Sequence, residues 1–233
     1  MEFTGERVIE GKTPERIWQD HMYRYRFAAS RLRGKRVLDA ACGVGYGCKI
    51  IKDAQATEVV GADVAADAIE LARERYASAG IEFLVADLMV LDLGARQFDA
   101  VVSFETIEHV PDAARALGNL HRLLVAGGTL FISTPNRPVT SPLRRLTDPP
   151  LNPHHVVEFT AREFRRLLER SGFRVREILG QRGAPRFAYL PGLRRVLGRL
   201  APDLYAPGVG SGELEPASWR KEYRYLTAIC ERA

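Results

Sequence analysis

A glycine-rich turn early in the chain places the strongest constraint on its fold. Residues 37–47 read Val-Leu-Asp-Ala-Ala-Cys-Gly-Val-Gly-Tyr-Gly, with glycines at positions Gly43, Gly45 and Gly47. The short apolar run at the start predicts a buried strand, and the residues from Tyr46 onward are typical of a helix. Glycine lets a backbone turn tightly and approach a bound group that a Cβ atom would exclude. The segment therefore predicts a strand, a ligand-binding turn and a helix.

The acid in this segment indicates which ligand suits the turn. A helix N-terminus favours a negative group, and nucleotide phosphates are the usual guests of such turns. However, Asp39 ends the strand, and a carboxylate beside the turn repels phosphate but attracts an ammonium group. The spacing G-x-G-x-G also lacks the third, helix-packing glycine of the dinucleotide fingerprint. The expected ligand therefore carries adjacent positive and negative groups, as the methionine part of S-adenosylmethionine (SAM) does.

Acids also follow the next two predicted strands. The second strand, over 58–62, ends on Asp63, and an acid at the end of the second strand of a βαβ unit can accept both hydroxyls of a ribose. The third, over 81–86, ends on Asp87 and Leu88, where a carboxylate and the next amide can reach an adenine edge. The ordered acids thus indicate a nucleoside site.

With two further predicted strands, over 98–104 and 129–134, the chain resembles the class I SAM-dependent methyltransferases from about residue 33 to the C-terminus. The motifs that carry the resemblance are VLDAACGVGYG, GADV, ADL, FDAVVSFETIEHV and LLVAGGTLFISTPN. A dinucleotide dehydrogenase, or an inactive relative with the same sheet, would explain the ordered acids less well. The resemblance implies SAM as the cofactor, with these contact residues: Asp39, Ala41, Gly43, Gly45, Asp63, Val64, Asp87, Leu88 and Phe104.

Helix and strand signals alternate along the rest of the chain. The further predicted elements are helices over 67–79, 113–125 and 160–172, strand six over 173–179 and strand seven over 225–230. Thr160 and Glu163 have the spacing of a capping box, and Gly80 is a good helix stop. Alternating strands and helices predict an α/β fold with a mostly parallel sheet. The resemblance implies a Rossmann-like sheet of seven strands in the order 3-2-1-4-5-7-6, with strand seven antiparallel and helices on both faces.

The length of 233 residues fits one domain over 1–233 with its own core. Three segments lie outside the predicted core: an N-terminal cap over 1–32 and substrate-side insertions over 135–159 and 181–222. In related methyltransferases an N-terminal helix covers the cofactor, so His21 or Tyr25 can line the site, although both can equally serve packing. The segment 135–159 holds six prolines and suggests a lid or substrate loop.

The most distinctive motif is Glu105-x-x-Glu108-His109, just past the fourth predicted strand. Side chains at positions i, i+3 and i+4 share one face of a helical turn. Carboxylates with an imidazole suit Mg²⁺ or Mn²⁺, and His154 or His155 could add a ligand. The expected metal ligands are therefore Glu105, Glu108, His109 and His155.

Two subfamilies share this motif. The ubiquinone-pathway O-methyltransferases follow it with T-x-N and a later histidine, which His154 matches better. The small-RNA 2′-O-methyltransferases follow it with P-N and H-x-x-E-[FW]-T, which His155 matches through residues 155–160. Many metal-free methyltransferases also carry E-H-V here, and His109 or His155 would then act as general base. The expected catalytic residues are His109, His155 and Glu108.

The expected reaction is methyl transfer to a hydroxyl, with nitrogen acceptors left open. A chain of this size favours a small hydroxylated acceptor such as a sugar, a natural-product intermediate or a quinone precursor. The net charge of +5, with eleven Arg and three Glu between residues 162 and 199, favours an RNA terminus as the alternative acceptor. A SAM-binding sensor without catalysis is the third alternative.

Composition also bears on location. No apolar run approaches the length of about 20 residues of a membrane span, and the N-terminus lacks a signal-peptide pattern. The three cysteines show no paired or metal-like spacing. A cytoplasmic protein with reduced thiols is the expectation, and the oligomeric state is not predicted.

Overall fold

The computed structural model of the chain describes residues 8–186, 211–218 and 220–233. Its strands are β1 (Arg36–Ala40), β2 (Glu58–Asp63), β3 (Glu82–Val85), β4 (Phe98–Phe104), β5 (Leu124–Pro135), β6 (Phe173–Pro185), β7 (Glu215–Pro216) and β8 (Lys221–Arg232). Its helices are α1 (Glu15–Ala29), α2 (Tyr46–Asp53), α3 (Ala66–Tyr76), α4 (Ala113–Leu123), α5 (Arg137–Thr140) and α6 (Ala161–Arg170), and a 3₁₀ turn, η1 (Ala77–Ala79), follows α3. No helix in these ranges is long and apolar enough to cross a membrane.

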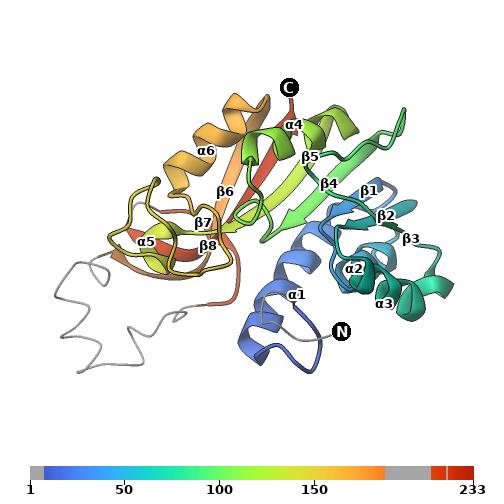
Figure 1. The fold of residues 1–233 in the computed structure, drawn as a ribbon, viewed down its shortest axis with the longest axis horizontal. Coiled ribbons are helices and arrows are strands. Elements are labelled where there is room, and N and C mark those ends of the chain that lie inside the picture. The colour runs from blue at the N-terminus through green and yellow to red at the C-terminus, as the bar shows by residue number, and fades with distance from the viewer. Residues whose placement is uncertain (1–7, 187–210, 219) are drawn as a thin grey trace.

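The strands form one sheet in the order β3-β2-β1-β4-β5-β8-β6-β7 (Figure 1). The strands β1 to β5 pair in parallel, whereas β8 runs antiparallel to both β5 and β6. The predicted order is confirmed, with β8 as the predicted strand seven. The sheet gains one strand that was not predicted, β7, whose two residues pair with the middle of β6. A two-residue strand is too short to show a hydrophobic period.

Several elements differ from the prediction in length. Strand β5 begins at Leu124, directly after α4, and its register against β4 shifts before Thr129. Strands β6 and β8 extend beyond the predicted bounds, so residues 181–185 and 221–222 belong to the sheet rather than to an insertion. An added Cβ on Gly180 or Gly183 would approach the ring of Tyr223 within 3 Å. These glycines make room for an aromatic ring on the sheet.

Helices cover both faces of the sheet, as predicted. One buried cluster packs Leu117 and Leu120 of α4 with Phe164 and Leu168 of α6. The cluster on the other face contains Ala28 of α1 and residues of α2 and α3, and Figure 1 shows these three helices together. Strands β1, β2, β4 and β5 each contribute residues to both clusters, and neighbouring residues such as Val101 and Val102 point to opposite faces, which is the period of two that a pleated strand imposes.

Local signals set the starts of two helices. The capping box at α6 is confirmed, because the Thr160 hydroxyl accepts from the Glu163 backbone N–H (3.3 Å) and the Glu163 carboxylate accepts from the Thr160 backbone N–H (2.8 Å). Asp112 caps α4 by accepting from the backbone N–H of Arg115 (2.9 Å). Such caps each stabilise a helix start by about 1 kcal/mol.

The segment between β5 and α6 is tied at its base. Asn136 and Phe159 form a bridge, and the guanidinium of Arg137 donates to the carbonyl of Glu158 (3.0 Å) and to the Glu163 carboxylate (2.7 Å). The segment therefore holds its residues at the carboxyl end of β5, beside the ends of β1, β2 and β4. In an open parallel sheet, this edge is where ligands bind.

Candidate functional site

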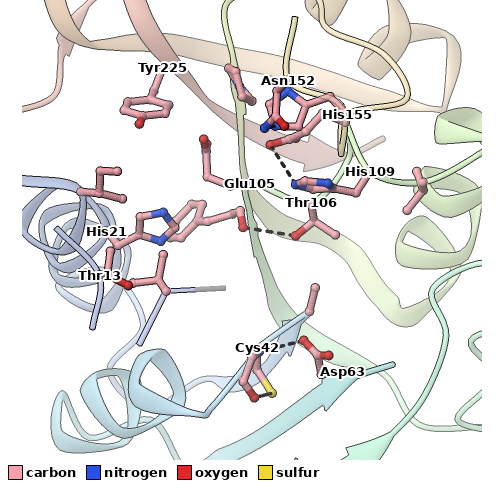
Figure 2. Close-up of a pocket in the computed structure, with 18 of the residues that line it drawn as sticks. Thr13, His21, Cys42, Asp63, Glu105, Thr106, His109, Asn152, His155 and Tyr225 are labelled. Carbon is pink, nitrogen blue, oxygen red and sulfur yellow. Dashed lines mark hydrogen bonds and ion pairs between the residues drawn. The ribbon is translucent and has the colours of Figure 1, made fainter. Parts of the chain in front are cut away.

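A cavity of about 730 Å³ lies at the carboxyl ends of the parallel strands. One part of its wall is built from α1, the glycine turn, the ends of β2 and β4, and the residues after β4. The other part is built from the segment between β5 and α6 and from Arg224 and Tyr225 of β8. Figure 2 shows Cys42 and Asp63 at one end and His109, His155 and Asn152 at the other. The volume lies within the range of small-molecule sites.

The end of the cavity near β2 is organised by Asp63. Its Oδ2 accepts from the backbone N–H of Gly43 and its Oδ1 from the backbone N–H of Ala65, each at 2.9 Å. Gly43 has a φ of +54°, and nothing lies within 4 Å of the position that a Cβ would take. Gly43 lines the cavity, so the turn leaves open space where a ligand can approach the backbone. This cradle and the carboxylate beside it fit a nucleoside ligand.

The other two glycines of the turn serve packing instead. A Cβ on Gly45 would lie 2.8 Å from the ring of Phe83 and 2.9 Å from the side chain of Ala72. A Cβ on Gly47 would lie 2.1 Å from the ring of Tyr25. Neither glycine lines the cavity. The structure therefore places Gly45, predicted to contact the cofactor, at the contact of the turn with α3 and β3.

Asp39 lies behind the cavity wall. Its carboxylate is fully buried and accepts from the Tyr25 hydroxyl (3.1 Å) and the Cys48 thiol (3.3 Å). Burial raises the pKa of Asp39 to about 7, and the charge of Asp63 contributes. Asp39 is absent from the cavity lining, so the structure does not bring this predicted contact residue to the surface of the site.

The remaining predicted cofactor contacts divide in the same way. Ala41, Val64, Leu88 and Phe104 line the cavity together with Gly43 and Asp63. Asp87 does not line the cavity, and its side chain accepts from the backbone N–H of Met89 (2.8 Å) in its own turn.

Helix α1 forms one side of the cavity, and both His21 and Tyr25 line it. The Nδ1 atom of His21 lies 3.1 Å from the hydroxyl of Tyr46. Burial, together with the charge of Arg24, holds the pKa of His21 well below its usual value. His21 is therefore neutral at physiological pH and available for hydrogen bonding.

The end of the cavity beyond β4 brings together Glu108, His109 and His155. One ligand atom from each lies within 4.8 Å of the others, and the two imidazole rings meet edge-on with centroids 4.9 Å apart. The Oε2 atom of the buried Glu108 accepts from the Thr134 hydroxyl (3.1 Å), whereas its Oε1 has no hydrogen-bond partner among the described residues. Burial, together with the charge of Glu105, raises the pKa of Glu108 well above its usual value.

Glu105, the fourth predicted metal ligand, stands apart from this group. It has a φ of +52°, its carboxylate accepts from the Ser133 hydroxyl (2.6 Å), and it lies 3.9 Å from the guanidinium of Arg24. Glu105 lines the cavity but does not converge with the other three. The positive φ turns the residue away from the helical geometry on which the prediction relied.

The fold sets the proton positions on both histidines. The Nδ1 atom of His109 lies 3.0 Å from the backbone carbonyl of His154. A carbonyl only accepts, so Nδ1 carries the proton and Nε2 is the basic nitrogen. His155 Nδ1 lies 2.6 Å from Glu158 Oε1. The carboxylate accepts a hydrogen bond from this nitrogen, so Nδ1 of His155 also carries the proton. His155 Nε2 lies 2.9 Å from the amide nitrogen of Asn152.

Glu158, Asn152 and Thr140 were missed by the sequence reasoning. All three line the cavity, and Glu158 is buried between His155 and the Thr140 hydroxyl (2.6 Å). Burial alone would raise the pKa of Glu158, but the hydrogen bonds from His155 and Thr140 hold it below the usual value. The H-x-x-E spacing of His155 and Glu158 was visible in the sequence and could have indicated this pair.

The donor set of the group formed by Glu108, His109 and His155 fits a divalent cation. Two unprotonated imidazole nitrogens and a buried carboxylate oxygen without a hydrogen-bond partner are suitable ligands. The carboxylate that holds His155 Nδ1 is the kind of partner that orients metal-binding histidines. The same three groups can instead bind an acceptor and take its proton.

Comparison with known proteins agrees with this geometry. A family model described as a methyltransferase domain matches residues 17–178. The chain is 40% identical over 181 residues to a probable SAM-dependent methyltransferase of Mycolicibacterium smegmatis, covering 77% of this chain and 68% of that protein. It is 35% identical over 111 residues to a ubiquinone biosynthesis O-methyltransferase of Coxiella burnetii, covering 46% of each.

A solved structure gives the same fold. A SAM-dependent methyltransferase from Mesorhizobium loti superposes with a TM-score of 0.61 at 22% identity, covering 89% of this chain and 98% of that one. The family match extends from α1 into β6 and includes the glycine turn, Asp63 and the motif after β4. The chain therefore belongs to the class I SAM-dependent methyltransferases.

Proposed function

We propose that the protein transfers the methyl group of SAM to a hydroxyl group of a small molecule. The observation that carries the proposal is the continuity of the cavity, which joins the turn at Gly43 and Asp63 to the group of Glu108, His109 and His155. A donor held at the first end has its reactive part directed toward proton-accepting groups at the second. The similarity to an O-methyltransferase supports a hydroxyl acceptor.

SAM supplies a methyl group on a sulfonium, which needs no further activation by the protein. The chain's own residues must hold the acceptor in line and receive its proton. We assign proton acceptance to His109, whose Nδ1–H is fixed on the carbonyl of His154, so that Nε2 is the basic nitrogen. His155 is oriented by Glu158 and Asn152, and its ring lies beside that of His109 in the cavity wall.

The assay is methyl transfer from labelled SAM to a panel of sugars, catechols and other hydroxylated molecules. His109→Ala should lower kcat by 100-fold or more, the range of general-base catalysis, and leave the Kd for SAM within about twofold. His154→Ala leaves the backbone carbonyl in place and should keep most of the activity. Equal losses of activity in both variants would show that His109 is not the base. Absence of methyl transfer to any hydroxyl would contradict the proposal.

As an alternative to the base at His109 Nε2, we propose that a divalent cation, Mg²⁺ or Mn²⁺, assists the reaction at Glu108, His109 and His155. When bound there, it would lower the pKa of the acceptor hydroxyl. In that case His109 Nε2 coordinates the ion instead of taking the proton, and the proton of the acceptor passes to water. The Oε1 atom of Glu108, buried without a hydrogen-bond partner among the described residues, supports this assignment.

Calorimetry with Mn²⁺ tests the metal directly. Wild type should bind one ion, and Glu108→Gln should lose this binding while its affinity for SAM stays unchanged. Activity that is indifferent to EDTA, together with no Mn²⁺ binding, would leave the metal-free mechanism with His109 as the base.

A further inference from the structure

Arg224 brings a positive charge to the cavity wall beside Tyr225, which Figure 2 shows on the side away from Cys42 and Asp63. It lines the cavity next to Tyr225, near the start of strand β8, which begins at Lys221. Its Nε donates to the Tyr225 hydroxyl (3.3 Å), and its guanidinium carbon lies 5.6 Å from the centre of the Tyr225 ring. These contacts orient the guanidinium, but neither of them brings a negative charge to it.

The carboxylates in this part of the molecule have other partners. Glu105 accepts from a serine hydroxyl, Glu108 from a threonine hydroxyl, and Glu158 from a histidine and a threonine. Glu222, on the same strand, pairs with an arginine at 2.9 Å. Among the described residues, no carboxylate forms an ion pair with Arg224, although several lie in the same cavity wall.

A second guanidinium lies behind the wall and, like that of Arg224, beside the Tyr225 ring. Arg24 of α1 is fully buried, and its guanidinium carbon lies 4.8 Å from the centre of the Tyr225 ring. It donates to Gln181 (2.5 Å) and faces Glu105 at 3.9 Å, whereas its Nε and Nη2 atoms have no hydrogen-bond partner among the described residues. Tyr225 therefore lies near two arginines, of which Arg224 reaches the cavity.

We propose that Arg224 binds an oxyanion on the acceptor, so that the substrate is a hydroxylated molecule carrying a carboxylate or a phosphate group. The inference rests on the proposed function and adds the class of acceptor to it. A guanidinium presents a planar fork of donors that pairs with both oxygens of such a group. An acceptor anchored at Arg224 would present its hydroxyl to His109 and His155 from the same end of the cavity.

Matched probe pairs test the charge requirement. The pairs are 3,4-dihydroxybenzoate with 3,4-dihydroxybenzamide, glucuronate with glucose, and glucose 6-phosphate with glucose. Binding to the protein loaded with S-adenosylhomocysteine is measured by calorimetry, and methyl transfer is measured with labelled SAM. The first two pairs report a carboxylate and the third reports a phosphate.

Three variants separate charge from geometry. Arg224→Gln removes the charge, Arg224→Lys keeps it without the fork, and Arg166→Gln on the exposed face of α6 is the matched control for a lost arginine. Thermal melting of each variant, with and without S-adenosylhomocysteine, confirms that the fold and cofactor site survive.

The wild type should bind at least one anionic probe about tenfold or more better than its neutral partner, as expected for a charge-assisted pair. Arg224→Gln should reduce this preference to within twofold, Arg224→Lys should keep part of it, and Arg166→Gln should keep all of it. The inference is overturned if no anionic probe is preferred or if the preference survives in Arg224→Gln. Preference in binding without any methyl transfer would reject the proposed function alone, and transfer to neutral acceptors only would reject the inference alone.

Discussion

Replacing Asp39 with asparagine should stabilise the free protein at alkaline pH. The side chain is fully buried, and burial raises its pKa from 3.8 to about 7. In the unfolded chain the group ionises near pH 4, so between pH 4 and 7 the folded state holds a proton that the unfolded state has lost. The stability from this group is therefore fully present below pH 4 and is lost as pH rises toward 7.

The magnitude follows from the same pKa difference. Between pH 5 and pH 8 the wild type should lose about 3 kcal/mol that Asp39→Asn retains. Asparagine copies the protonated acid, because its oxygen can accept from Tyr25 and its amide can donate to Cys48, the two groups that contact Asp39. The geometry of the site should survive the change.

Urea denaturation of both proteins at pH 5 and pH 8 measures the effect. The difference in free energy of unfolding, variant minus wild type, should grow by roughly 3 kcal/mol toward pH 8. A difference that is independent of pH would show that Asp39 is ionised in the folded protein at both pH values and would contradict the raised pKa of its carboxyl group.

The same variant should bind SAM less tightly. If the carboxylate of Asp39 attracts the ammonium of SAM, as the sequence predicts, binding must release its proton. Wild-type affinity should then rise with pH up to about 7, and Asp39→Asn should show a weaker, pH-independent affinity. Calorimetry in buffers of different ionisation enthalpy reports the released proton.

Three further substitutions separate binding from packing around the glycine turn. Asp63→Asn should weaken SAM by about tenfold or more in calorimetry, because charged hydrogen bonds are worth about 1.5–3 kcal/mol, and unchanged affinity would remove Asp63 from the site. Gly47→Ala should lower the free energy of unfolding by about 1–3 kcal/mol in urea titrations, because its Cβ would lie 2.1 Å from the Tyr25 ring. Gly43→Ala, at an open position with positive φ, should reduce SAM affinity more than stability, and the opposite order in these two glycine variants would contradict their assignments.

The sheet could be predicted from the sequence because its signals are local. Buried runs, glycine stops and the capping box at Thr160 each lie within a few residues, and the resemblance supplied the strand order. The outer parts of β6 and β8 could not be predicted in the same way. Residues 181–185 were predicted to belong to an insertion, and the contact of Gly180 and Gly183 with the ring of Tyr223 is a tertiary contact that the sequence does not reveal.

The cofactor end of the cavity was predicted in part for a related reason. Gly43 and Asp63 both lie in the cavity wall, because position along a parallel strand fixes which edge of the sheet a residue reaches. Which way a side chain turns at that edge depends on its neighbours. Asp39 is enclosed by Tyr25 of α1 and by Cys48 of α2, a tertiary contact that spacing does not reveal. We therefore predicted that Gly45 contacts the ligand, whereas its packing against Phe83 and Ala72 is what requires a glycine at this position.

The acceptor end depends on a contact between two motifs that are far apart in sequence. The backbone N–H of Val156 donates to the carbonyl of Glu108 (2.7 Å), and His109 Nδ1 bonds to the carbonyl of His154 (3.0 Å). The E-x-x-E-H turn and the H-x-x-E segment thereby fix one another. The tautomers of both histidines follow from this pairing. The backbone carbonyl of His154 accepts a hydrogen bond from Nδ1–H of His109, and the carboxylate of Glu158 accepts one from Nδ1–H of His155.

That pairing predicts that the function of the site depends on the segment between β5 and α6. Glu158 accepts from His155, and the Thr140 hydroxyl donates to Glu158 (2.6 Å). The Thr140 hydroxyl, which is not part of the group of Glu108, His109 and His155, therefore helps to set the orientation of the His155 imidazole. Removing the Thr140 hydroxyl should loosen His155 without touching His109, the proposed proton acceptor. The acceptor site is therefore preorganised by backbone and buried hydrogen bonds rather than by the five residues of the motif alone.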